Sequence, residues 1–166
     1  MRTFLADLLE RLHPARSEAP SPEAVEALVE AVLESLGVEG ARDESDEGVV
    51  WSLQVGSAPI EIALQTNEVL QEPTIEICAP ILRLPAANLL AFYRRCLELN
   101  RIVVGCAIGV EDDVVMVAAE RRLPGLDRAQ FVEMLLNVAS AADEFDDVLA
   151  AEFGAEKLGE EPDPPA

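Results

Sequence analysis

Residues 111–113 hold the carboxylates best placed for catalysis in this chain. Glu111 or Asp113 could serve as an acid or base in an enzyme, because positioned carboxylates transfer protons at many active sites. The same run stands between two apolar, strand-like segments, where a β-hairpin needs polar turn residues. A hairpin tip is the simpler interpretation, and an enzyme that uses these carboxylates stays as an alternative.

A cysteine nucleophile would need partners that the sequence does not place beside it. Cys96 is close in sequence to Arg94, Arg95 and Arg101, whose charges could lower the pKa of its thiol. It also falls in an apolar helical stripe, and the single histidine, His13, lies in the N-terminal segment. A histidine-based triad or dyad cannot be assembled inside the domain, so we expect no catalytic residues.

Metal and cofactor sites are not expected either. The three cysteines, Cys78, Cys96 and Cys106, have no CxxC spacing, and one histidine makes zinc improbable. The acidic stretch at residues 38–48 lacks the alternating oxygen ligands of a calcium loop, and there is no Walker-type or GxGxxG motif. We therefore expect no metal, no cofactor, and three reduced, buried thiols in a cytoplasmic protein.

Acidic residues dominate the chain: 32 Asp and Glu stand against 12 Lys and Arg, a formal net charge of −20. Phosphate binding needs clustered basic residues, so we do not expect nucleic acid as a partner. Residues 83–128 differ from the rest, because seven Arg against six Asp or Glu give them a net charge of about +1. This segment is either a contact surface between acidic flanks or core with a few satisfied arginines.

Apolar periodicity predicts four helices. The first, residues 1–12, is amphipathic and too short to be stable alone, so it must dock on its own domain or on a partner subunit. It has no basic face and no apolar run is long enough to span a bilayer, so we expect no membrane partner. Further helices are expected at 22–36, 86–99 and 128–153. Their ends are marked by cap residues, including a capping box: Ser21, Gly37, Asp127 with Gln130, and Gly154.

Alternation of apolar with polar or small residues predicts five strands, at 48–55, 59–65, 74–84, 101–110 and 114–120. Residues 38–48 are polar and contain Gly, which predicts a surface loop. The expected fold is α+β, with an antiparallel five-stranded sheet packed with helices. The element order is helix–strand–strand–strand–helix–strand–strand–helix, preceded by the extra N-terminal helix.

Three regions follow from this order. Residues 1–20 are the N-terminal amphipathic helix and its linker, residues 21–154 are the domain, and residues 155–166 are a disordered acidic tail.

The helix at 86–99 is apolar over more than half of its circumference, and such a helix must be buried on two sides. One side can face the sheet, and a second copy of the chain is the simplest cover for the other. We expect Leu89, Phe92, Tyr93 and Leu97 to form the surface for self-association or partner binding.

Residues 88–149 carry a resemblance to known proteins. They contain LELNR at 97–101, a small-residue strand, an acidic hairpin tip and AADEFDDVL at 141–149. This pattern resembles the YbjN family and the related type III secretion chaperone-like (CesT-like) group. The resemblance implies a secretion chaperone-like fold, often homodimeric and without enzymatic activity, and it supplies no catalytic residues. Residues 1–12 look like an addition to the usual pattern.

The resemblance implies two kinds of function. The secretion chaperones are acidic cytoplasmic proteins that hold an unfolded effector segment, whereas YbjN-like proteins are described as sensory-transduction regulators. We expect a non-catalytic acidic protein-binding domain, a homodimer that binds a protein or peptide segment. The alternative is a regulatory dimer in sensory transduction that binds a folded partner.

Overall fold

The computed structural model describes residues 20–37, 41–45, 48–55, 58–67 and 71–158. The helix predicted at residues 1–12 lies outside this part of the chain. The described residues form three helices and six strands in this order: α2 (Pro22–Leu36), β1 (Ala41–Ser45), β2 (Gly48–Val55), β3 (Ala58–Asn67), β4 (Glu72–Arg83), α3 (Leu89–Asn100), β5 (Ala107–Glu111), β6 (Val114–Arg122) and α4 (Arg128–Phe153).

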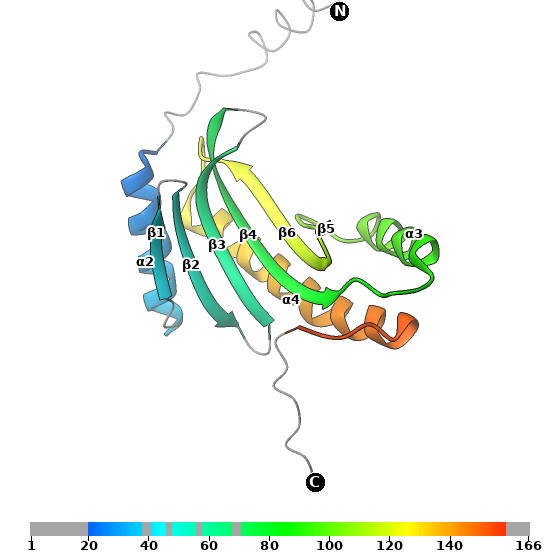
Figure 1. Ribbon diagram of the computed structural model, residues 1–166. Coiled ribbons are helices and arrows are strands. Elements are labelled where there is room, and N and C mark those ends of the chain that lie inside the picture. Colours follow the sequence, from blue (N-terminus) through cyan, green and yellow to red (C-terminus); the bar gives the residue numbers. More distant parts are fainter. Residues whose placement is uncertain (1–19, 38–40, 46–47, 56–57, 68–70, 159–166) are drawn as a thin grey trace, which may run out of the picture.

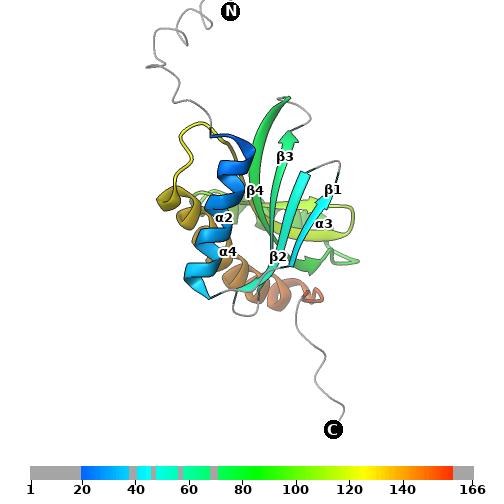
Figure 2. The same ribbon diagram turned by 90° about the vertical axis from the view of Figure 1, so that its left-hand side faces the viewer.

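All six strands join one antiparallel sheet in the order β1-β2-β3-β4-β6-β5. Helices α2 and α4 lie on the same face of this sheet in both views (Figures 1 and 2). The hairpin β5–β6 follows α3 and joins the sheet through β6 and β4. The α+β class is confirmed, and the sheet has one strand more than predicted.

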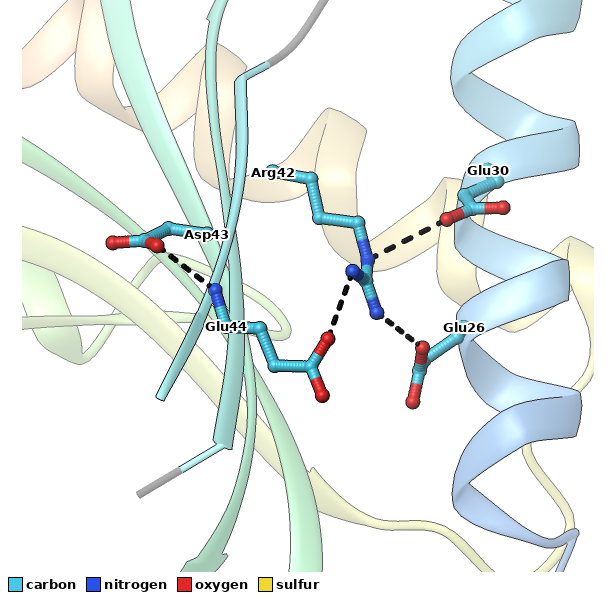
Figure 3. A network of polar contacts seen from close by, with 5 residues as sticks. All are labelled: Glu26, Glu30, Arg42, Asp43 and Glu44. Atoms are coloured by element: carbon cyan, nitrogen blue, oxygen red, sulfur yellow. Dashed lines mark hydrogen bonds and ion pairs between the residues drawn. The ribbon is translucent and has the colours of Figure 1, made fainter. Parts of the chain in front are cut away.

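The additional strand is β1, which replaces the predicted surface loop. Its sequence ARDES has no apolar alternation, because it is an edge strand whose described side chains stay exposed. It pairs with β2 along its whole length, and Arg42 adds ion pairs beside this ladder. The Arg42 guanidinium lies 2.7 Å from the Glu26 carboxylate and 3.6 Å from that of Glu30, both on α2, and 3.1 Å from Glu44 (Figure 3).

The core lies between the sheet and its two helices. Alternate residues of the central strands point to this face, as the period-2 pattern predicted, and Trp51, Ile62 and Ile77 are almost fully buried there. The long helix α4 contributes Phe131 and Leu135 from the other side. One face of the sheet is therefore buried, which agrees with the alternating pattern that predicted the strands.

Most predicted helix caps are present. The Ser21 hydroxyl accepts the Ala24 N–H at 3.3 Å, and Gly37 and Gly154 adopt the left-handed conformation that ends a helix. At the start of α4 the Asp127 carboxylate accepts the Gln130 N–H at 2.9 Å. The capping box is incomplete, because the Gln130 side chain accepts a hydrogen bond from Arg121 at 2.6 Å.

Helix α3 begins three residues later than predicted. Asn88, directly before it, has φ 60° and ψ 27°, a left-handed conformation that cannot continue an α-helix. Pro85 is buried before that turn.

Of the two neighbours of β4, β3 stops pairing before the end of the strand, whereas β6 stays paired up to Arg83. The pairing with β3 ends at Glu61↔Cys78, whereas β4 continues to Arg83. On the β6 side the register shifts between Pro80 and Leu82, where proline has no N–H to give to the ladder. A fork therefore opens between β3 and the last residues of β4.

Residues 155–158 lie in this fork, although the tail was expected to begin at residue 155. The Arg83 N–H donates to the Glu156 carbonyl, and the Leu158 N–H donates to the Ile81 carbonyl, both at 2.9 Å. The sequence predicted a disordered tail here because these residues are held by backbone hydrogen bonds, which a pattern of apolar side chains does not reveal.

Candidate protein-binding surfaces

Helix α3 contacts both β5 and the C-terminal end of α4. Phe92, Cys96 and Leu99 are buried on the side that makes these contacts. The Phe92 ring meets the Phe153 ring edge-to-face at a centroid distance of 5.2 Å. Beside it, Arg95 Nε lies 3.0 Å from Glu152 of α4.

The opposite side of α3 is apolar and exposed. Leu90 is 86% exposed, Leu97 70%, Tyr93 40% and Leu89 38%. Of the four residues predicted to form an association surface, Leu89, Tyr93 and Leu97 lie on this side. Phe92 differs, because it is fully buried (0% exposed) and supports the helix from inside the domain.

The exposed surface continues into the segment that follows α3. Ile102 and Val104 are exposed there, close to Asn137 and Glu144 of α4. We call Leu89, Leu90, Tyr93, Leu97, Ile102 and Val104 the α3 patch. Sequence reasoning missed Ile102 and Val104 because it placed residues 101–110 in one strand, whereas β5 begins only at Ala107.

Small residues allow this segment to approach α4 closely. Gly105 has φ 77°, and a Cβ on it would lie 2.5 Å from Asn137 Nδ2. The Cys106 thiol donates to the Asn137 carbonyl at 3.7 Å. The chain therefore approaches α4 closely at Gly105, next to Ile102 and Val104.

A second candidate surface is the sheet face opposite α2 and α4, which we call the open sheet face. Small or flexible side chains form its centre and are partly exposed: Ala63, Cys78, Met116 and Ala118. Cross-strand pairing places carboxylates among them, with Glu61 opposite Cys78 and Glu76 opposite both Ala63 and Glu120. This face combines an apolar floor with negative charge.

Burial, and after it the negative charge, shifts the pKa values of groups on this face. Burial, together with the charges of Glu120 and Glu111, raises the pKa of the Glu76 carboxyl. Burial and the nearby carboxylates raise the pKa of the Cys78 thiol to about 12. The face therefore favours cations, and its thiol stays protonated at neutral pH.

The cysteines show no activation as nucleophiles. All three are free thiols, and burial also raises the pKa of Cys96 and Cys106. Two of the arginines that could have activated Cys96 are engaged elsewhere, since Arg94 Nε lies 2.9 Å from Glu98 and Arg95 pairs with α4.

Residues 112 and 113 form the hairpin tip that the sequence predicted. Asp112 occupies the β5–β6 turn with φ 51°, and the Asp113 carboxylate lies 3.0 Å from Arg83 Nη1. In the described part of the chain, no group of three or more His, Cys, Asp or Glu is arranged to hold a metal ion. No described helix is long and apolar enough to cross a bilayer.

The sequence matches the model of one known protein family. Residues 26–151, more than half of the chain, match the model of the YbjN family, described as "Putative bacterial sensory transduction regulator". The chain belongs to the YbjN family. The resemblance inferred from residues 88–149 is confirmed. No curated protein sequence matches the chain.

Solved structures share the fold. A chain from the crystal structure of the ExsC–ExsE complex is similar with a TM-score of 0.60 at 16% identity, over 78% of this chain and 96% of that one. A chain from the HopA1–SchA chaperone–effector complex is similar with a TM-score of 0.52 at 9% identity, over 74% of this chain and 93% of that one. At these identities the likeness shows the fold alone, and the expected secretion chaperone-like fold is confirmed.

Proposed function

We propose that this YbjN-family chain is a non-catalytic protein-binding domain that works as a homodimer and binds a segment of a partner protein. The observation that carries the proposal is the α3 patch, six apolar side chains that stay exposed on an otherwise well-packed domain. Burying such a patch in a protein contact removes apolar surface from water.

The charge distribution supports a second copy of the chain as the cover for the α3 patch. Two chains of net charge −20 repel each other unless they meet where the charge is low. Residues 83–128 contain the α3 patch and carry about +1 (seven Arg minus six Asp and Glu). An isologous contact there brings two near-neutral surfaces together and keeps the acidic flanks apart.

Several arginines of this segment form ion pairs within the fold. Arg83, Arg95 and Arg122 pair with Asp113, Glu152 and Glu72 respectively. These arginines neutralise the carboxylates that they pair with. Apolar contact is then the main attraction between the two subunits.

The open sheet face is the surface that we assign to the partner segment. An extended or amphipathic segment with apolar and basic residues fits an apolar floor flanked by Glu61, Glu76 and Glu120. A chaperone–effector complex among the structural relatives agrees with a protein as the bound molecule. The three free thiols fit the reducing conditions of the cytoplasm.

The second candidate is a regulatory dimer that binds a folded signalling partner. The family description favours it, because it names sensory transduction. An affinity pull-down of the full chain from native extract distinguishes the two. A single stoichiometric protein held in a protease-sensitive state supports the client-binding function, whereas a folded regulator or kinase supports the alternative.

The dimer is tested by placing charge in the α3 patch. Tyr93→Glu should convert the dimer into monomers, measured as mass by light scattering over a range of concentrations. Leu36→Glu is the matched control, because Leu36 is 52% exposed on α2 and lies outside the patch. A folded Tyr93→Glu variant that keeps the dimer mass removes the α3 patch from the interface, and a monomeric wild-type chain refutes the dimer.

A further inference from the structure

The last residues of β4 have a free edge where the sheet forks. Pairing with β3 stops at Cys78, so the β4 edge at Ile81–Arg83 is not used by that neighbour. A strand edge of this kind presents backbone N–H and C=O groups that pair with any extended segment of suitable geometry.

The chain fills this edge with its own C-terminal segment. Gly154 ends α4 in the left-handed conformation, and the chain then turns back toward the ends of β3 and β4 (Figure 1). Leu82 and Lys157 form an antiparallel bridge, held by the two backbone hydrogen bonds of Arg83 and Ile81. The segment is thus a short strand added to β4.

Lys157 fixes the register of this added strand. Its ammonium group lies 3.4 Å from Asp146 Oδ2 and also pairs with Asp147, both on α4. It is the single lysine in the sequence. The Lys157 side chain is only 21% exposed, so the site positions one cation against two carboxylates beside the β4 edge.

The chain's own segment is a limited ligand for this edge. It offers two backbone hydrogen bonds, and the sequence after it, GEEPDPPA, contains three prolines, which lack the N–H that a longer ladder needs. Residues 155–166 carry five charged residues, four acidic and one basic, in a protein of net charge −20. Apart from Lys157, the charge of the segment opposes its docking.

From this arrangement we infer that the β4 edge at Ile81–Arg83 is a strand-addition site for a partner protein, closed in the free chain by residues 156–158. The partner is an extended segment with a basic residue at the position of Lys157 and few acidic neighbours. It displaces the C-terminal segment and takes over the Arg83 N–H and the Ile81 carbonyl. The inference rests on the proposed protein-binding function. It names the β4 edge, beside the open sheet face, as the place where a bound segment pairs with the sheet.

The exchange is tested with a fluorescent synthetic peptide of residues 155–166 and the full-length chain. The Leu158→Pro variant of the chain removes the N–H that pairs with Ile81 and so opens the site, whereas Leu158→Ala keeps that N–H and is the control. The Leu158→Pro chain should bind the peptide at least tenfold more tightly than the wild-type chain, because an intramolecular segment competes at an effective concentration of about millimolar. The same peptide carrying Leu158→Pro should bind neither chain.

A second peptide tests the chemistry of the partner. Glu160→Lys with Glu161→Lys in the peptide should tighten binding to the Leu158→Pro chain at low salt, and the gain should disappear at high salt. Equal affinity of the wild-type and Leu158→Pro chains for the first peptide overturns the inference. The inference is also overturned if a folded Leu158→Pro chain does not bind the first peptide.

The reactivity of Lys157 separates this inference from the proposed function. An amine-specific reagent should modify Lys157 at least tenfold faster when a captured partner is bound, because the displaced segment frees the ammonium group from Asp146. A partner that binds without changing this rate preserves the proposed function and refutes strand exchange. Peptide binding to the Leu158→Pro chain together with the absence of any captured partner preserves the strand-addition site and removes the proposed function.

Discussion

Replacing Leu97 by alanine should weaken the proposed dimer strongly. The change removes three carbon groups, each worth about 0.8 kcal/mol when buried, or about 2.4 kcal/mol for a side chain that passes from full exposure to full burial. Leu97 is 70% exposed in the single chain, so about 1.7 kcal/mol is available per subunit. An isologous interface contains the residue twice, which gives about 3.4 kcal/mol and a dissociation constant about 300-fold higher.

Sedimentation velocity over a dilution series measures this constant directly. Leu36→Ala removes the same atoms from a side chain that is 52% exposed on α2, and it should leave the dissociation constant unchanged. An unchanged constant for Leu97→Ala, or equal weakening by Leu36→Ala, would refute the reasoning that the α3 patch is the interface. Far-UV circular dichroism verifies that both variants remain folded.

Three further predictions concern the domain itself, and denaturant unfolding measures each of them. Phe92→Ala should lower the free energy of unfolding by about 3–5 kcal/mol, because the ring is fully buried; a loss below about 1 kcal/mol would contradict that burial. Glu76→Gln should stabilise the fold at pH 7. The folded state raises the pKa of Glu76 above 4.5, so ionisation opposes folding and the gain should vanish as the pH falls below 4.5; a gain that persists in acid would refute this cause. Gly105→Ala should cost at least about 1 kcal/mol because of its φ of 77° and its closeness to α4, whereas Gly109→Ala meets only ordinary contact at 3.8 Å and should cost less; equal losses would contradict the assigned close approach.

Patterns of apolar residues predicted the parts of the fold that bury apolar surface. The strands β2, β3, β4 and β6 and the helices α2 and α4 all have one buried face, and the period of that face is visible in the sequence. The edge strand β1 has charged residues at 42–44 and no such period. Its pairing is decided by backbone hydrogen bonds and by Arg42, which a periodicity argument does not detect.

The candidate surface on α3 was predictable only in part, for a related reason. Periodicity showed that this helix has two apolar sides, but it could not tell which side faces the domain. Phe92 and Tyr93 are neighbours in the sequence, yet Phe92 packs on Phe153 whereas Tyr93 is 40% exposed. Only the position of α4 decides between them, and that position depends on contacts between residues about sixty apart.

The charge on β1 has a consequence for the protein at high concentration. An edge strand offers backbone groups on which further chains can stack, and such stacking begins many fibrils. A second copy that paired with β1 would have to place a strand beside the charged residues Arg42, Asp43 and Glu44. The charge of this edge therefore disfavours aggregation through β1 and leaves the apolar α3 patch as the surface for association.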